Sequence, residues 1–351
     1  MHRAVFRRSP SSVPDVAPFL THKGCAVKIC IVGDYLSRYR ERIQTLFPTD
    51  EVLWAHTAED DIVRDALEDL DVFVGPVFTS EMAHRARRLR LVQVPGAGTD
   101  GVAIDALPPS ALCANVYRHE SSVAEYVLGA AIALRRRFQD QDRNLRQDIW
   151  DTATYDPSVA YGRTLLSAEV GFVGYGHIGA ATWTLLEAIG VRGGRAVSRS
   201  GKSAEGRASS LKWLGTPSDT DRLFDESDLV VVSAPLSAET NGLIGAEQLD
   251  LLGKDGIIIN VGRAGLIQEE PLFNALQRGT IAGAAVDVWY SYPEAGSGRP
   301  SSYPFKDLTN ILMTPHSAAL TDETYSARLE DIAINIERSR KGFRPINLVM
   351  P

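Results

Sequence analysis

Three polar residues in the second half of the chain, Arg263, Asp287 and His316, each lie at or just after the end of a short apolar run. Such runs are typical of buried strands, and open α/β sheets bind their ligands at the carboxyl ends of parallel strands. A guanidinium can bind a carboxylate through two hydrogen bonds, and an imidazole can give or take a proton near neutral pH. The pattern therefore favours proton transfer at a carbonyl or alcohol carbon, although either residue alone is more often structural.

A glycine-rich stretch earlier in the chain has the spacing GxGxxG and lies between the apolar run EVGFV and a helical pattern. In that context the first glycine permits a tight turn, the second lets backbone N–H groups approach a pyrophosphate, and the third lets strand and helix pack closely. The spacing alone would also fit a plain glycine-rich turn, but its context predicts a dinucleotide site. We assign to it Gly174, Tyr175, Gly176, His177, Ile178 and Gly179, with His177 expected to face solvent rather than to catalyse.

The end of the next predicted strand indicates which nicotinamide cofactor is used. An NAD site usually has an acidic residue there, about 20 residues after the glycines, to bind the ribose hydroxyls. Here the strand ends in Val197-Ser198-Arg199-Ser200, with Lys202 just beyond and no acid between them. A guanidinium and hydroxyl groups suit a ribose 2′-phosphate, so the sequence predicts NADP(H) over NAD(H). The glycines at 193–194 leave the register of this strand open by one residue.

These residues lie within a repeating pattern of apolar runs separated by helical stretches. Short runs rich in Val, Ile and Leu indicate parallel strands that helices cover on both faces. The sequence therefore predicts an α/β protein with two doubly wound parallel-sheet domains. The expected strands lie near 26–34, 71–76 and 89–98 in the first part, and near 169–173, 195–200, 228–236, 256–262, 281–289 and 310–316 in the second.

Two long helical patterns flank the second series of strands. The first runs from Ser121 to about Gln147, with Ser121 or Ser122 as the expected N-cap. Its first half is apolar and its second half charged, and we expect Arg135–Arg137 to form a solvated face rather than an anion site. The second pattern covers 321–342 and ends at a glycine; we expect it to return to the first domain.

Composition narrows the possible classes of protein. The 351 residues suffice for two domains, and a formal net charge of −7 argues against a nucleic-acid binder, which needs a basic surface. Cys25, Cys30 and Cys113 are too few for a disulfide framework, and no Cys or His cluster has metal-site spacing. No apolar run approaches the ~20 residues needed to cross a bilayer. We therefore expect a cytoplasmic protein without a metal, a membrane or a nucleic-acid partner.

Residues 1–25 differ in character from the rest of the chain. They are rich in Arg, Ser and Pro and contain no acidic residue before Asp15. A transit peptide shares part of this composition, but the prolines interrupt any amphipathic helix. We expect 1–25 to be a flexible N-terminal extension or an over-long start.

Seven stretches, in the expected order, resemble the NAD(P)-dependent D-isomer-specific 2-hydroxyacid dehydrogenase family. They are VPGAGTD, SVAEY, GYGHIG, SAPLSAETNGLI, INVGRAGLIQEEPLFNAL, GAAVDVW and TPHSAA, and the resemblance covers about residues 26–346. It implies a Rossmann cofactor domain at 119–318, inserted into a flavodoxin-like substrate-binding domain made of 26–118 plus 319–351. It also implies a hinged homodimer.

The same resemblance implies roles for individual residues. Arg263 would bind the substrate, His316 would be the acid/base, and Asp287 would hold the nicotinamide carboxamide. Backbone N–H groups of Gly96, Ala97 and Gly98 would bind the substrate carboxylate. The remaining cofactor-lining residues would be Ala234 and Gly262.

One position departs from the family pattern. The family usually places a Glu just before a Pro, five residues after the strand Asp, to pair with the histidine; here Tyr292 precedes the proline and Glu294 follows it. Tyr292 could orient the imidazole, Glu294 could take the Glu's place if the loop bulges, or catalysis could be weaker. We favour Tyr292, which holds the ring without adding negative charge. The imidazolium is then less favoured, and reduction should have its optimum at lower pH than with a Glu.

Two functions from different classes fit these features. The first is an enzyme that moves a hydride between a nicotinamide and the α carbon of a small 2-oxo or 2-hydroxy acid, of the glyoxylate or hydroxypyruvate kind. The second is an NAD(P)-sensing binding protein of the same fold. The absence of the usual Glu beside the histidine favours this alternative. The presence of both Arg263 and His316 favours the enzyme, because a sensor needs no proton donor.

Overall fold

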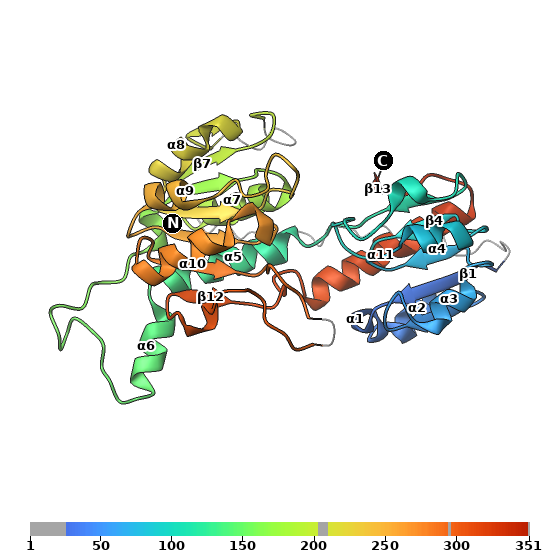
Figure 1. Ribbon diagram of the computed structural model, residues 1–351, viewed down its shortest axis with the longest axis horizontal. Helices are drawn as coiled ribbons and strands as arrows, with labels where there is room; N and C mark the ends of the chain where they lie inside the picture. The colour runs from blue at the N-terminus through green and yellow to red at the C-terminus, as the bar shows by residue number, and fades with distance from the viewer. Residues whose placement is uncertain (1–25, 203–209, 294–295, 350–351) are drawn as a thin grey trace, which may run out of the picture. The chain divides into compact units, whose positions relative to one another are not determined.

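The computed structural model describes residues 26–202, 210–293 and 296–349. Residues 1–25, for which we predicted an extension, lie outside the described residues. The chain divides into two compact units. Their residues can be found in Figure 1 by the colour bar, which follows residue number. Unit 1 contains the chain up to Arg118 and from Asp322 onward, and unit 2 runs from His119 to Thr321. The second predicted boundary, after residue 318, lies close to this one.

Unit 1 has a six-stranded sheet in the order β13-β5-β4-β3-β1-β2. Omitting β13, this is the flavodoxin-like order 2-1-3-4-5. The strands are β1 (Lys28–Val32), β2 (Glu51–Ala55), β3 (Val72–Val74), β4 (Leu91–Gln93), β5 (Leu112–Ala114) and β13 (Leu348–Val349). The edge strand β13 pairs antiparallel with β5, whereas the other strands of this sheet pair in parallel as predicted. The chain enters the last helix from unit 2 rather than from a strand of this sheet, so no β–α–β crossover imposes a parallel direction.

Side chains alternate between the two faces of this sheet, and each face packs against its own layer of helices. Ile29 and Ile31 share one apolar cluster with the last helix, whereas Cys30 and Phe73 belong to the cluster on the opposite face. A strand buried on both faces needs such a continuous apolar run. The helices of unit 1 are α1 (Asp34–Ser37), α2 (Arg40–Leu46), α3 (Asp61–Ala66), α4 (Ser80–Arg85), a 3₁₀ turn (Ile104–Ala106) and α11 (Asp322–Arg340).

Unit 2 has a seven-stranded, wholly parallel sheet in the order β12-β11-β10-β9-β6-β7-β8. This order extends the 3-2-1-4-5-6 arrangement of the Rossmann fold by one strand. The two-domain α/β fold predicted from the sequence is thereby confirmed. The strands are β6 (Glu169–Val173), β7 (Gly193–Val197), β8 (Trp213–Gly215), β9 (Leu229–Val232), β10 (Ile257–Asn260), β11 (Gly283–Val286) and β12 (Ile311–Met313).

Helices cover both faces of the unit 2 sheet. Val123, Val127 and Trp183, from α5 and α7, belong to one apolar cluster, and residues of α8, α9 and α10 belong to the other. The helices of unit 2 are α5 (Glu120–Arg135), α6 (Phe138–Leu145), α7 (His177–Ala188), α8 (Thr220–Asp225), α9 (Ala246–Leu252) and α10 (Glu269–Arg278). No helix among the residues described in both units is long and apolar enough to span a membrane.

The single helix predicted for 121–147 is two helices. α5 begins at Glu120 with His119 at its N-cap, and the chain breaks at Arg137, whose φ of 56° is left-handed. The Arg135 side chain is buried rather than solvated: Nη1 donates to Asp228 Oδ1 at 2.9 Å and Nε donates to the Thr164 carbonyl at 3.1 Å. The prediction of a solvated face was therefore wrong for Arg135, because its ion-pair partner lies far away in sequence.

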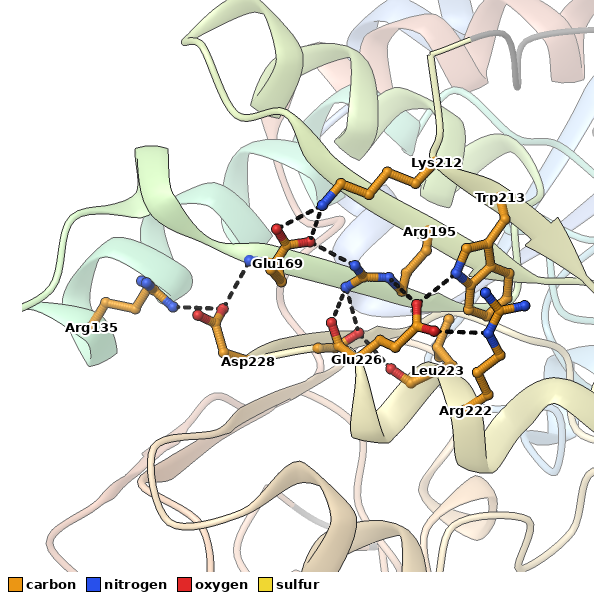
Figure 2. A network of polar contacts seen from close by, with 10 residues as sticks. Arg135, Glu169, Arg195, Lys212, Trp213, Arg222, Leu223, Glu226 and Asp228 are labelled. Carbon is orange, nitrogen blue, oxygen red and sulfur yellow. Dashed lines mark hydrogen bonds and ion pairs between the residues drawn. The ribbon is translucent and has the colours of Figure 1, made fainter.

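A network of ion pairs occupies the amino-terminal side of the unit 2 sheet (Figure 2). The buried guanidinium of Arg195 donates to Glu169 Oε2 at 2.6 Å and lies 3.3 Å from Glu226 Oε2. Lys212 binds the same Glu169 carboxylate, and Arg222 and the Trp213 indole bind Glu226. Burial raises the pKa of Glu169, but hydrogen bonds from Lys212 and Arg195 outweigh it, and the net pKa is lowered. Each charge in this network thus has a partner of opposite sign.

Candidate active site

The glycine-rich turn after β6 requires glycine at its first and third positions, for reasons that its backbone shows. Gly174 has a φ of 94°, and a Cβ there would lie 2.5 Å from the Ala234 backbone nitrogen. A Cβ at Gly179 would lie 2.7 Å from the Gly174 carbonyl oxygen. At Gly176 an added Cβ would meet no described protein atom within 4 Å. No described protein contact therefore requires the second glycine, and an open approach at the start of α7 fits a bound pyrophosphate.

The three side chains inside this turn have different surroundings. Tyr175 is buried, and its ring packs edge-on against Phe172 with the centroids 5.7 Å apart. His177 is exposed at the first position of α7, as its place in the loop suggested. Ile178 is half-buried and packs against the apolar cluster of α5 and α7. Tyr175 and Ile178 thus pack into the core, whereas His177 and the backbone at Gly176 are exposed.

The end of β7 lies beside the glycine turn. The Gly174 N–H donates to the Val197 carbonyl at 3.0 Å, which fixes the register that the sequence left open, with Ser198 directly after the strand. The Ser198 hydroxyl donates to the Lys202 carbonyl at 3.0 Å. Arg199 and Ser200 are exposed. A hydrogen bond from Ser237 is the main cause of the lowered pKa of Glu239, and the charge of Arg199 adds a smaller effect.

The ends of β9 and β10 meet at the position of Arg263. A Cβ at Gly262 would lie 2.9 Å from the Ala234 carbonyl oxygen, so only glycine permits this approach. Asn260 brackets the turn, because its Nδ2 donates to the Arg263 carbonyl at 3.1 Å and its Oδ1 accepts from the Gly262 N–H. Arg263 Nη1 donates to the Gly262 carbonyl at 2.9 Å. Sequence reasoning missed Asn260, although a buried polar residue at the end of an apolar strand was a usable signal.

His316 follows β12 in a left-handed backbone conformation, with a φ of 56°. Its Nδ1 lies 3.0 Å from the Tyr292 hydroxyl oxygen, which also accepts the Trp289 N–H at 3.2 Å. A phenolic oxygen can accept two hydrogen bonds, so it can hold the imidazole tautomer that carries its proton on Nδ1. No described residue forms a hydrogen bond with Nε2. The imidazole is therefore held from one side, with its other nitrogen available for proton transfer.

Asp287 supports the backbone that carries His316. Its carboxylate is buried and accepts hydrogen bonds from the Thr314 hydroxyl at 2.7 Å and from the Ser317 and Ala318 N–H groups at 2.8 and 3.0 Å. Such bonds on both sides of His316 stabilise the left-handed turn, which is costly for a residue other than glycine. No local pattern predicts this support, since the donors are recognisable only once the turn is formed.

The surroundings of His316 set its protonation. Part of its side chain is exposed, but the enclosing protein desolvates the ring, and this burial is the main cause of its lowered pKa. The negative charge of Asp287 raises the pKa, and the positive charge of Arg263 lowers it further. The net effect is a pKa below the ordinary 6.5. The influence of Arg263 also shows that the two predicted catalytic residues lie within electrostatic range of each other.

The remaining predicted site residues lie elsewhere. Gly96, Ala97 and Gly98 belong to unit 1, where they form a half-buried turn after β4. Glu294, the alternative partner for His316, lies outside the described residues. Among the described residues no group of three or more His, Cys, Asp or Glu could hold a metal ion. Unit 2 therefore brings together His316, Tyr292, Asp287 and Arg263, all at the carboxyl ends of its strands.

Comparison with known proteins agrees with this fold. Residues 128–318 match the family model described as D-isomer specific 2-hydroxyacid dehydrogenase, NAD binding domain. A glyoxylate reductase of Korarchaeum cryptofilum is 27% identical over 334 residues, which cover 92% of this chain and 95% of the relative. A D-3-phosphoglycerate dehydrogenase of Methanocaldococcus jannaschii is 28% identical over 316 residues. That match covers 89% of this chain but only 57% of the relative's length.

Solved structures show the same architecture. The NADPH-dependent glyoxylate/hydroxypyruvate reductase of Sinorhizobium meliloti, solved with NADP and malonate, superposes with a TM-score of 0.74. It is 24% identical and covers 92% of this chain and 96% of its own, so the likeness concerns the fold. The family match and the nucleotide-binding fold together identify an NAD(P)-dependent oxidoreductase of the 2-hydroxyacid dehydrogenase class. The chain belongs to the D-isomer specific 2-hydroxyacid dehydrogenase family, which confirms the resemblance found in the sequence.

Proposed function

We propose that this protein transfers a hydride between NAD(P)H and the α carbon of a small 2-oxo or 2-hydroxy acid of the glyoxylate or hydroxypyruvate kind. The observation that carries the proposal is the imidazole of His316, held through Nδ1 by Tyr292 and within electrostatic range of Arg263. An acid/base beside a carboxylate-binding guanidinium is what 2-oxo acid reduction requires. The named activities of relatives, glyoxylate reductase and glycerate dehydrogenase, agree with it.

Each residue has a distinct part in this reaction. Arg263 binds the substrate carboxylate and polarises the neighbouring carbonyl. In reduction the His316 imidazolium donates a proton from Nε2 to the forming alkoxide, and in oxidation the neutral ring removes it. Tyr292 keeps the Nδ1–H tautomer, so the lone pair of the neutral ring lies on Nε2. The backbone N–H groups of Gly96–Gly98 add donors for the carboxylate. The nicotinamide, when bound, supplies or accepts the hydride.

The cofactor would be held by residues from four strand ends of unit 2. The glycine turn and the start of α7 would bind the pyrophosphate through backbone N–H groups. Asp287 would accept a hydrogen bond from the nicotinamide carboxamide with lone pairs that its three intramolecular bonds leave over. By the family resemblance Ala234 and Gly262 would also line the cofactor, and their backbones approach so closely that a Cβ at Gly262 would lie 2.9 Å from the Ala234 carbonyl oxygen.

We further infer a preference for NADP(H) over NAD(H). The three residues that directly follow β7 are Ser198, Arg199 and Ser200, and none is acidic. The exposed Arg199 guanidinium is available to bind a 2′-phosphate. Arg199→Ser should lower kcat/KM for NADPH about 10- to 100-fold, the loss of one charge-assisted hydrogen bond, while kcat/KM for NADH changes little. A wild-type protein that uses NADH more efficiently than NADPH would overturn this preference.

Turnover separates the enzyme from the NAD(P)-sensing alternative. Oxidation of NADPH and of NADH should be followed by absorbance with a panel of 2-oxo acids that includes glyoxylate, hydroxypyruvate and pyruvate. We expect turnover with at least one of them. Tight NAD(P)H binding without any turnover across the panel would instead support a sensor and would overturn the proposed activity.

A homodimer is the assembly that we propose. Half of the exposed large apolar side chains among the described residues lie between 138 and 166, on α6 and the segment after it. Figure 1 shows this segment, in green, extended from the helices and sheet of unit 2. Exposed apolar clusters of this kind usually mark interfaces. Light scattering should give twice the chain mass for the wild type and a lower mass for Trp150→Ser/Tyr155→Ser; a monomeric wild type would contradict the proposal.

A further inference from the structure

The turn that holds Gly96, Ala97 and Gly98 is anchored through its carbonyl groups. The Gly96 carbonyl accepts the Val116 N–H at 3.2 Å, and the Ala97 carbonyl accepts Nδ2 of the Asn115 side chain at 2.8 Å. Both donors come from the segment that follows β5. The described chain has no cis peptide bond, and in a trans peptide the C=O and N–H groups point in opposite directions. The N–H groups of Ala97 and Gly98 therefore point away from this anchor.

These two N–H groups have no hydrogen-bond partner among the described residues, although the turn is half-buried. A Cβ added at Gly96 would meet no described atom within 4 Å, so the turn borders open space. Backbone donors that are partly buried and unpaired are uncommon unless a ligand or water satisfies them. Two adjacent N–H groups with the same orientation suit the two oxygens of a carboxylate.

Asn115 is a poor choice for stability alone. Its side chain is 5% exposed, and its Oδ1 is buried without a hydrogen-bond partner among the described residues. A buried, unsatisfied acceptor destabilises the folded state. The one hydrogen bond that the side chain forms in the described structure is the bond to the Ala97 carbonyl. An apolar residue of similar size would fill the same space without that cost.

Asn335 shows what a structural asparagine looks like in the same unit. It is fully buried, its Nδ2 donates to Gln93 Oε1 at 2.8 Å and to the Ile346 carbonyl at 3.1 Å, and its Oδ1 accepts the Ile346 N–H at 2.7 Å. Both ends of that amide are satisfied, and its bonds attach the C-terminal segment to the sheet. Asn115 differs in both respects. Only its Nδ2 forms a hydrogen bond in the described structure, and that bond leads to the turn at Ala97.

We propose that Asn115 is a positioning residue that orients the Ala97 and Gly98 N–H groups toward the carboxylate of the substrate. The inference rests on the proposed function, because it assumes a 2-oxo acid. Asn115 itself does not touch the substrate. It acts by fixing the direction of the peptide unit whose N–H group does. Such a contribution is made to substrate and transition state alike, so its loss should raise KM more than it lowers kcat.

The test compares Asn115→Leu with Asn335→Leu in the full-length protein. Asn115→Leu should raise KM for the 2-oxo acid about 10-fold, the loss of roughly one hydrogen bond, with kcat changed less than about 3-fold and the dissociation constant of NADPH unchanged. Its thermal midpoint should stay equal or rise. Asn335→Leu should lower the midpoint and leave KM unchanged. Asn115→Gln, which retains an amide on a longer stem, should recover part of the lost affinity.

The outcomes separate this inference from the proposed function. If Asn115→Leu loses stability while KM stays at the wild-type value, Asn115 is structural and the inference is overturned. An equal rise in KM for a methyl ester of the same acid would also overturn it, because the ester has no carboxylate to lose. If the wild type reduces no 2-oxo acid at all, the proposed function fails instead.

Discussion

The two ends of the unit 2 sheet handle charge in opposite ways. At the amino-terminal side Arg195, Glu169 and Glu226 form a closed network in which each charge has an opposite partner (Figure 2). At the carboxyl side Tyr292 and Asp287 support His316 and its turn from behind, while Nε2 of the imidazole has no hydrogen bond within the described structure. A closed network serves stability, whereas groups held from one side serve chemistry. Substitutions at the two ends should therefore affect different properties.

The largest effect should come from His316→Ala. Removal of the general acid should lower kcat for 2-oxo acid reduction by about 10²- to 10⁴-fold. The dissociation constant of NADPH and the thermal midpoint should stay near their wild-type values, since the one hydrogen bond that the imidazole forms in the described structure is to the exposed Tyr292. Steady-state or stopped-flow assays measure kcat, and calorimetry measures the dissociation constant and the thermal midpoint. A variant that keeps more than a tenth of wild-type kcat would remove His316 from the mechanism.

Arg195→Ala should show the reverse pattern. The substitution removes a buried stem and several hydrogen bonds, so the free energy of unfolding should fall by about 2–4 kcal/mol. Because Arg195 lies on the side of the sheet away from the glycine turn, kcat/KM at low temperature should be unchanged. Arg195→Met, which retains an apolar stem, should lose less stability. Unfolding in urea measures the loss, and a large fall in kcat/KM with intact stability would contradict the division between the two ends.

The pH dependence of reduction should reveal the lowered pKa of His316. Reduction requires the imidazolium, so kcat/KM should fall as the pH rises through that pKa, and the midpoint should lie below 6.5. Oxidation requires the neutral ring and should gain activity over the same interval. Tyr292→Glu adds a negative charge beside Nδ1 and should move both midpoints upward by about one pH unit.

Tyr292→Phe is the control for that profile. It removes the hydrogen bond to Nδ1 without adding charge, so kcat should fall about 3- to 10-fold while the midpoint moves little. An unchanged profile in Tyr292→Glu would show that Tyr292 does not set the protonation of His316. Residue 294 would then be the position to substitute next.

The sequence predicted the elements whose signals are local. The glycine turn, the last helix and most strands of unit 2 each carry an apolar run or a cap within a few residues, and these predictions were correct. Strands β2, β5, β8 and β13 were missed. Strands β2, β8 and β13 are edge strands that are only partly buried, so they lack the continuous apolar run of a central strand. The break at Arg137 was missed because the charged sequence after it is equally compatible with continuing the helix.

The candidate site was predictable in part for the same reason. Arg263 and His316 could be found because each ends an apolar strand. The roles of Asn115, and of Asp287 as the acceptor of three hydrogen bonds, could not be predicted. Their partners become neighbours only after folding. The burial of Arg135 was also unpredictable, since its partner Asp228 is remote in sequence. Long-range polar pairing is thus the part of this molecule that pattern reasoning does not reach.

The most direct test of the central claim, that Arg263 and His316 act on one substrate molecule, is a double-mutant cycle. kcat/KM for the preferred 2-oxo acid should be measured for wild type, Arg263→Ala, His316→Ala and the double variant. If the guanidinium orients the carbonyl for the imidazole, the double variant should lose at least about 10-fold less than the product of the single losses. Losses that multiply without interaction would contradict a shared substrate.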